Sequence, residues 1–509
     1  MSAITTDNLR LVNCSNFIED IDQNNYYVFI GLPNYDEYFS DWNTNVPDPI
    51  DNFYYLDSYK DTILGVKKIT SSDVIRVIPK ISWSSGVKYD MYRHDYSRYN
   101  LTNITNSTRL YDSRYYVMNS EYRVYICLYN GISPENPNGI VSINEPTHTS
   151  ESPQIESDGY IWKYLYTITP AEALKFDSTN YISVPNNWST SQTSEISRIR
   201  DSSVNGKIEV ILIEKSTTYA INQSVYNDVE IIGDGVGGRA TVEFDEEAKP
   251  YRVTVTDGGS GYTFATLNLD ALVKPVAEKS IFNVIIPPPG GHGRDIYKEL
   301  GAFRALIYSR IENSITNPDF IEGNQFARIG IIKGITQYGS ETLFDSDTGS
   351  GVFALKLTGD ASEEPEDSII LQPSTGAKGL LVSTILADSS SIIKYIKPRE
   401  NYLDTYSSGN IQKTFDPYLT SFSGITTASS YSNTNFNSNS ITINGNSYTI
   451  DTSYSGSQIG DTFLGQNFIS GFSNPDINIK SGEIVYIDNR VSVTRQSQQR
   501  EDIKVIIEF

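Results

Sequence analysis

Short, largely apolar runs recur along this sequence, and stretches rich in turn residues separate them. Runs with many aromatic and β-branched side chains lie at residues 26–31, 74–78, 123–129 and 161–166. Short runs of this composition, bounded by turn residues, are typical of β-strands. We therefore predict a mainly β protein, with a layered antiparallel β-sandwich core, short helices and small inserted all-β modules.

Few segments predict helices. Thr169-Pro170-Ala171-Glu172 combines a capping hydroxyl, a proline at the first helical position and a glutamate three residues after the cap, which predicts a short helix to about residue 176. A second helix is expected at residues 295–300, after the Pro- and Gly-rich stretch 287–291. Residues 42–61 are rich in Pro, Asp and Tyr and are predicted to form a long ordered surface loop.

The end of the chain contains two further runs with a two-residue period, at residues 482–490 and 502–509. We expect these runs to pair with each other as strands and to place Phe509 in a sheet. Termini are poorly ordered unless they are held in this way.

Two segments differ from their surroundings in residue composition and in the spacing of their turns. Residues 205–289 contain strand patterns separated by tight glycine turns, which predicts an inserted all-β module. Residues 345–480 are rich in Ser, Thr, Asn and Gly, and within them residues 440–450 carry Asn444-Gly445 at the centre of a hairpin pattern. We predict that this second segment is a β-rich arm.

Composition limits the class of protein. With 509 residues, the chain has the length of two to four domains, and its 36 tyrosines suit half-buried sheet faces and subunit interfaces. The net charge of −22 argues against a nucleic-acid partner. Residues 1–11 do not resemble a signal peptide and no apolar run approaches the ~20 residues of a membrane span, so we expect cytoplasmic synthesis and no membrane insertion.

Glycine and cysteine motifs give little indication of chemistry. Residues 233–238 match the Gly-x-Gly-x-x-Gly spacing of dinucleotide sites, but a strand pattern follows where such a site needs a helix, so a glycine hairpin is predicted. Cys14 and Cys127 lie too far apart to form a metal or redox motif. Cys127 is predicted to be a small buried apolar residue.

Candidate catalytic groups are few. His292, Arg294 and Asp295 cluster in a glycine-rich loop that lacks an evident partner residue, so we interpret it as structural. Carboxylate pairs in aromatic-rich loops are compatible with glycoside cleavage but are more simply explained as solvated surface groups. These pairs are Asp36 with Glu37, Asp57 with Asp61, and Glu156 with Asp158. No catalytic, cofactor or metal site is therefore predicted.

Several segments together resemble a known family. The chain has, in order, Asp158-Gly159-Tyr160, an apolar residue, Trp162 and an aromatic strand, then the short proline-containing helix and the strand Asn180-Tyr181-Ile182-Ser183-Val184-Pro185. This order is similar to that of the baseplate wedge subunit of T-even-type contractile phages. Segments 27–31, 63–66, 77–83, 326–332 and 482–509 look like further strands of that subunit.

The resemblance implies a non-enzymatic structural protein. Members of the family form homodimers of layered β-sandwich subunits that bind other wedge proteins in the virion tail baseplate, which is assembled in the host cytoplasm. Segments 1–204, 290–344 and 481–509 would form the core, whereas segments 205–289 and 345–480 resemble additions in the longer versions of related cyanobacterial phages. The alternative function is a tail-associated receptor-binding adhesin or polysaccharide-cleaving enzyme.

Overall fold

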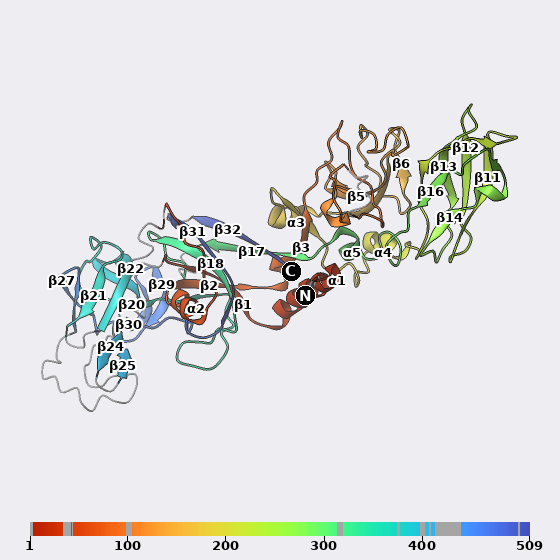
Figure 1. Ribbon diagram of the computed structural model, residues 1–509. Coiled ribbons are helices and arrows are strands. Elements are labelled where there is room, and N and C mark those ends of the chain that lie inside the picture. Colours follow the sequence, from red (N-terminus) through yellow and green to blue (C-terminus); the bar gives the residue numbers. More distant parts are fainter. Residues whose placement is uncertain are drawn as a thin grey trace. The chain divides into compact units, whose positions relative to one another are not determined.

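The computed structural model describes residues 4–33, 42, 44–97, 104–312, 319–373, 377–397, 403–406, 409–412, 439–496 and 499–509. The chain folds into two compact units (Figure 1). Unit 1 contains Met1–Phe17, Ile75–Leu306 and Val505–Phe509, and unit 2 contains Ile18–Val74 and Ile307–Lys504. The prediction of a mainly β protein is confirmed, because both units consist of several antiparallel sheets with few helices.

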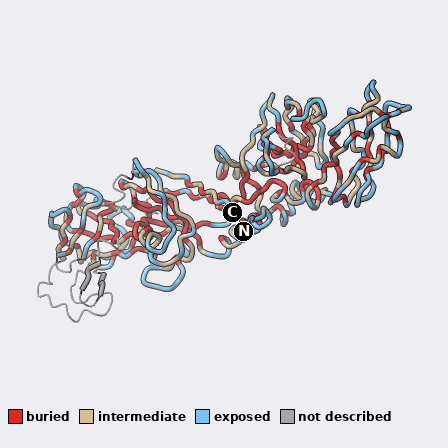
Figure 2. The backbone as a smooth tube through the Cα atoms, in the orientation of Figure 1, coloured by how far each residue is buried: buried red, intermediate tan, exposed pale blue. Residues whose placement is uncertain are grey.

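The core of unit 1 surrounds a four-stranded sheet. Its two central strands are buried on both faces, and Figure 2 shows long buried stretches of backbone inside this unit. The hydroxyls of buried tyrosines in these strands form hydrogen bonds to nearby backbone carbonyls. Tyr125 donates to the carbonyl of His148 at 2.7 Å, and Tyr166 donates to that of Ser183 at 3.0 Å. The strands in order are β4 (Tyr116–Met118), β5 (Arg123–Tyr129), β7 (Ile161–Thr167) and β6 (Gln154–Ile155).

Helix α3 (Pro170–Phe176) follows β7 and has the predicted capping box. The Thr169 hydroxyl accepts the Glu172 N–H at 3.2 Å, and the Glu172 carboxylate accepts the Thr169 N–H at 2.9 Å. The chain then enters β8 (Tyr181–Val184), which pairs with β3 (Val74–Pro79).

The second predicted helix is α5 (Ile296–Leu300). The Asp295 side chain accepts the Lys298 N–H at 3.2 Å, and Gly301 ends the helix in the left-handed conformation. Three helices were not predicted: α1 (Asp7–Gln23), α2 (Phe53–Lys60) and α4 (Ser194–Asp201).

The prediction of a continuous loop at residues 42–61 is wrong, because α2 lies within it. The Asn52 side chain accepts the Tyr55 N–H at 2.9 Å and caps this helix. Tyr59 is its one buried residue, so the helix has almost no apolar stripe from which it could be recognised.

Residues 208–284 contain a hydrophobic core of their own within unit 1. A four-stranded sheet supplies many residues of this core, and two shorter strand pairs add to it. The sheet order is β13 (Pro250–Asp257), β12 (Arg239–Phe244), β11 (Val225–Gly233) and β14 (Ala265–Leu267); the pairs are β9 (Ile211–Lys215) with β16 (Ile281–Val284) and β10 (Tyr219–Ala220) with β15 (Lys274–Pro275).

Unit 2 contains a five-stranded antiparallel sheet with β1 (Tyr26–Gly31) at its centre. Every residue of β1 is buried, and Tyr27 and Phe29 join Ile63 and Ile332 in the core below the sheet. The order is β19 (Thr348–Ser350), β2 (Ile63–Ile69), β1, β18 (Gln325–Lys333) and β31 (Glu483–Thr494).

A second sheet in unit 2 has a separate core, formed by residues 355–450. The hairpin predicted at residues 440–450 is confirmed, because β26 (Ser440–Ile443) pairs with β27 (Asn446–Thr449). Asn444 and Gly445 between them both have positive φ, as a type I′ turn requires. The order is β27 (Asn446–Thr449), β26 (Ser440–Ile443), β21 (Ile369–Gln372), β22 (Ala377–Ala387), β23 (Ser390–Ile396), β20 (Phe353–Lys356) and β30 (Phe472–Ser473).

Two further short strand pairs lie within the predicted arm. They are β24 (Leu403–Tyr406) with β25 (Gly409–Gln412), and β28 (Gly456–Ile459) with β29 (Thr462–Phe468). Much of the Ser/Asn-rich tract, residues 413–438, lies outside the described residues.

The prediction that the last two strands pair with each other is wrong. β31 pairs with β18, whereas β32 (Arg500–Glu508) belongs to another sheet, of order β32, β17 (Arg304–Glu312), β3 and β8. A two-residue period indicates that a segment is a strand but does not specify its neighbour. The end of the chain is nevertheless held, because the N–H of Phe509 donates to the carbonyl of Phe303 at 3.2 Å.

Candidate functional site

The glycine-rich loop of His292 is held by a buried carboxylate. His292 Nδ1 lies 2.6 Å from Glu299 Oε1, and the second oxygen of Glu299 accepts the Gly293 N–H at 2.7 Å. Glu299 is 1% exposed and the Tyr92 ring packs edge-on against the imidazole. The expectation that His292 lacks a partner is therefore wrong: the partner comes from α5, seven residues later.

The Glu156–Asp158 pair divides into two different roles. Asp158 organises a turn, because one of its oxygens accepts the N–H groups of Ile143 at 2.8 Å and Asn144 at 3.0 Å, and the other accepts that of Tyr160 at 3.1 Å. Burial raises the pKa of the Glu156 carboxyl, and the Asp158 carboxylate adds to this effect.

The Asp57–Asp61 pair is held by a lysine. Asp57 and Asp61 both contact Lys480, at 3.4 and 2.5 Å, and Asp61 is buried. Asp36 and Glu37 lie outside the described residues.

The Gly-x-Gly-x-x-Gly segment is a hairpin between β11 and β12, as predicted. Tyr262 packs over its glycines: its hydroxyl accepts the Gly238 N–H at 3.0 Å and donates to the Ile231 carbonyl at 2.9 Å. A Cβ at Gly235 would lie 2.5 Å from the Tyr262 ring, so these glycines are explained by packing.

Both cysteines are buried and free. Burial raises the pKa of the Cys14 thiol to about 11 and that of Cys127 well above its usual value. The prediction that Cys127 is a small buried apolar residue is confirmed. Among the residues described, no three His, Cys, Asp or Glu side chains gather as metal ligands.

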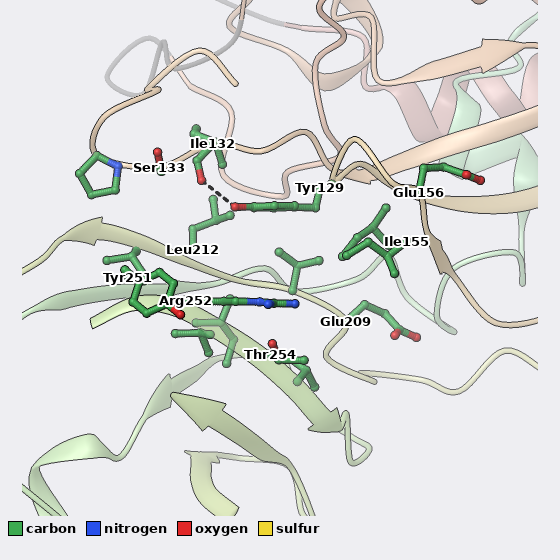
Figure 3. Close-up of a pocket in the computed structure, with 18 of the residues that line it drawn as sticks. Tyr129, Ile132, Ser133, Ile155, Glu156, Glu209, Leu212, Tyr251, Arg252 and Thr254 are labelled. Atoms are coloured by element: carbon green, nitrogen blue, oxygen red, sulfur yellow. Dashed lines mark hydrogen bonds between the residues drawn. The ribbon is translucent and has the colours of Figure 1, made fainter. Parts of the chain in front are cut away.

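A cavity in unit 1 lies between the ends of β5 and β7 on one side and β9 and β13 on the other (Figure 3). Its volume is about 520 Å³, within the roughly 300–1,000 Å³ of small-molecule sites. We call it the Tyr129–Arg252 crevice, after two residues on its opposite walls. Its other lining residues include Ile155, Glu156, Glu209 and Leu212.

The charged groups of the crevice are paired to different degrees. Arg252 Nε lies 3.8 Å from Glu243 and its side chain is 56% exposed, so the guanidinium is available to a ligand. Glu209 pairs with Lys207 at 2.9 Å. The Tyr129 hydroxyl donates to the carbonyl of Ile132 at 3.0 Å, which fixes the ring on its wall.

Sequence reasoning identified Glu156 but not the rest of this site. Tyr129 and Arg252 both lie in predicted strands, more than a hundred residues apart, and no local pattern indicates that they face one cavity. That proximity depends on how the 205–289 segment packs against the rest of unit 1.

Unit 2 has a second, more polar pocket of about 460 Å³, lined in part by Asp319 and Asp476. Burial raises the pKa of Asp476 to about 6, whereas burial lowers the pKa of the neighbouring Lys394 to about 8. The Ser350 N–H donates to Asp476 at 2.8 Å. These groups form a buried charged cluster.

Comparison of the chain with models of known protein families and with curated proteins gave no match in either case. Within the described part of the chain, no helix combines the length and the apolar character needed to cross a membrane.

Proposed function

We propose that this chain is a structural subunit of the baseplate wedge of a contractile phage tail. In this role it forms a homodimer that links neighbouring wedge proteins during baseplate assembly. The proposal rests on the family resemblance of the sequence and on where the resembling segments lie in the fold.

The main support for the proposal is the order of strands in the five-stranded sheet of unit 2. Four segments that resemble the wedge subunit, spread over more than 450 residues of sequence, are neighbouring strands β2, β1, β18 and β31 of this one sheet. Ile30 faces Gly65 on one side and Ile329 on the other, and Ile329 faces Asp488. Chance matches scattered along a chain have no reason to converge in this way.

The resembling segments of unit 1 also meet. Ile78 of β3 faces Ile182 of β8, and the Lys80 N–H extends the pairing by donating to the Asn180 carbonyl at 2.8 Å. Trp162, within the Asp-Gly-Tyr segment, is fully buried in the same unit. These residues have packing roles, as a structural subunit requires.

The two segments without a counterpart in the shorter wedge subunit hold separate hydrophobic cores, at residues 208–284 and 355–450. This arrangement favours an architecture in which modules have been added to a common core, because each addition satisfies much of its own apolar surface.

Complementation tests the proposal. A phage in which the gene for this chain is deleted should produce no complete baseplates, and the chain supplied in trans should restore them, as seen by electron microscopy of negatively stained lysates. The purified chain should sediment at twice its 56.9 kDa mass. Complete baseplates in the deletion phage, or a chain that stays monomeric at micromolar concentration, would contradict the proposal.

A further inference from the structure

The two walls of the Tyr129–Arg252 crevice present different chemistry. On one wall the Tyr129 ring is held by its hydroxyl bond to Ile132, which leaves the ring face toward the cavity. On the other wall Arg252 extends from β13 below that ring (Figure 3). A flat group between them would contact an aromatic face on one side and a guanidinium on the other.

Carboxylates lie toward one end of the crevice. Figure 3 shows Glu156 on the upper wall and Glu209 on the lower wall, both toward the side of the cavity where Ile155 lies. Both are hydrogen-bond acceptors, whereas Arg252 is a donor. A ligand that fills the crevice therefore has to offer donors and acceptors, as well as an apolar face for Tyr129.

These requirements for the ligand exclude two simple classes of molecule. An inorganic anion would bind the guanidinium but would be repelled by the two carboxylates, and a purely apolar molecule would remove the charged groups from water without replacing their hydrogen bonds. A neutral sugar meets every demand, because its hydroxyls both donate and accept while the C–H face of a pyranose ring packs on an aromatic ring.

We propose that the Tyr129–Arg252 crevice is a binding site for a neutral saccharide of one or two rings. This activity goes beyond the proposed structural role and does not depend on it. The two proposals fail separately, because tail assembly reports the first and sugar binding by the purified chain reports the second.

Saturation-transfer NMR of the full-length chain with maltose, lactose, cellobiose and N,N′-diacetylchitobiose tests the site. At least one of these disaccharides should receive saturation, most strongly at ring C–H protons. Arg252→Ala should weaken its binding about tenfold, the loss expected for a charged hydrogen bond. Tyr129→Ala should abolish binding, whereas Tyr129→Phe should retain it because the ring remains.

Arg239→Ala is the matched control. Arg239 lies on β12, the neighbour of β13, has carboxylate partners as Arg252 does, and does not line the crevice. This variant should bind like the wild type. Absence of saturation transfer to all four disaccharides would overturn the proposal, and so would binding that Arg252→Ala leaves unchanged. Because Arg252 is exposed, its replacement tests the site even if Tyr129→Ala unfolds the protein.

Discussion

The Phe29 ring packs directly over Gly330 across the β1–β18 pair of unit 2. The two residues face each other in the register, and a Cβ at position 330 would lie 2.3 Å from the Phe29 ring. The central sheet thus depends on the absence of a side chain at one position of a buried strand.

Replacing Gly330 with alanine should therefore destabilise unit 2. Overpacking of this kind costs about 1–3 kcal/mol, and the urea midpoint of unfolding should fall accordingly. Gly359→Ala is the control, because a Cβ there meets nothing within 4 Å. Adding Phe29→Leu to Gly330→Ala should recover part of the loss. An unchanged midpoint in the Gly330→Ala variant would contradict this packing.

Glu299→Ala should destabilise unit 1. It would leave the buried His292 ring and the Gly293 N–H without their acceptor, at a cost of about 1–3 kcal/mol for each unsatisfied group. Lys298→Ala on the same helix alters an exposed side chain and should have little effect. Equal unfolding midpoints for the two variants would show that the His292–Glu299 contact is not structural.

Asp476→Asn should stabilise unit 2 at neutral pH but not at low pH. Because burial raises the pKa of Asp476 to about 6, the native state holds this proton more tightly than the unfolded chain, whose usual value is 3.8. The stabilising effect of the proton is complete below about pH 4 and is lost as pH rises through about 6.

The variant should accordingly gain about 1–2 kcal/mol over the wild type at pH 7.5, allowing about 1.4 kcal/mol per pKa unit and a discount for partial exposure. The gain should vanish at pH 4. Urea unfolding at both pH values measures it, with the exposed Asp461→Asn variant as control. A gain of the same size at pH 4 would assign the effect to packing.

Deletion of residues 502–509 should lower the melting temperature sharply or prevent folding. Ile503 and Val505 of β32 are buried, and each contributes about 1.5–3 kcal/mol. The deletion also removes the contacts of Glu508 with Arg10 and Arg304. Glu508→Gln removes only the charge and should cost less than about 1 kcal/mol. Wild-type melting of the deleted chain would show that β32 is dispensable.

The sequence predicts individual strands better than their partners. The runs that became β1, β5 and β7 are recognisable because aromatic and β-branched content and flanking turn residues are local properties. The partners of β31 and β32 lie well over a hundred residues earlier in the chain, so the sequence suggested the wrong pair. Helix α2 escaped recognition because its stability comes from a cap and a single buried tyrosine.

The candidate site was less predictable than the fold. Asp158 and Glu156 are two residues apart and look equivalent in the sequence, yet one organises a turn and the other lines a cavity. Likewise, nothing next to His292 indicates that Glu299 folds back onto it. Such roles depend on long-range packing, which a local pattern does not contain.

Cryo-electron microscopy of the tails of the phage to which we assign this chain tests the central claim most directly. The proposed function predicts density for pairs of copies within each baseplate wedge, with the β2-β1-β18-β31 sheet recognisable in every copy. Finding the chain only at the tips of tail fibres, or not in the particle at all, would contradict the assignment as a wedge subunit.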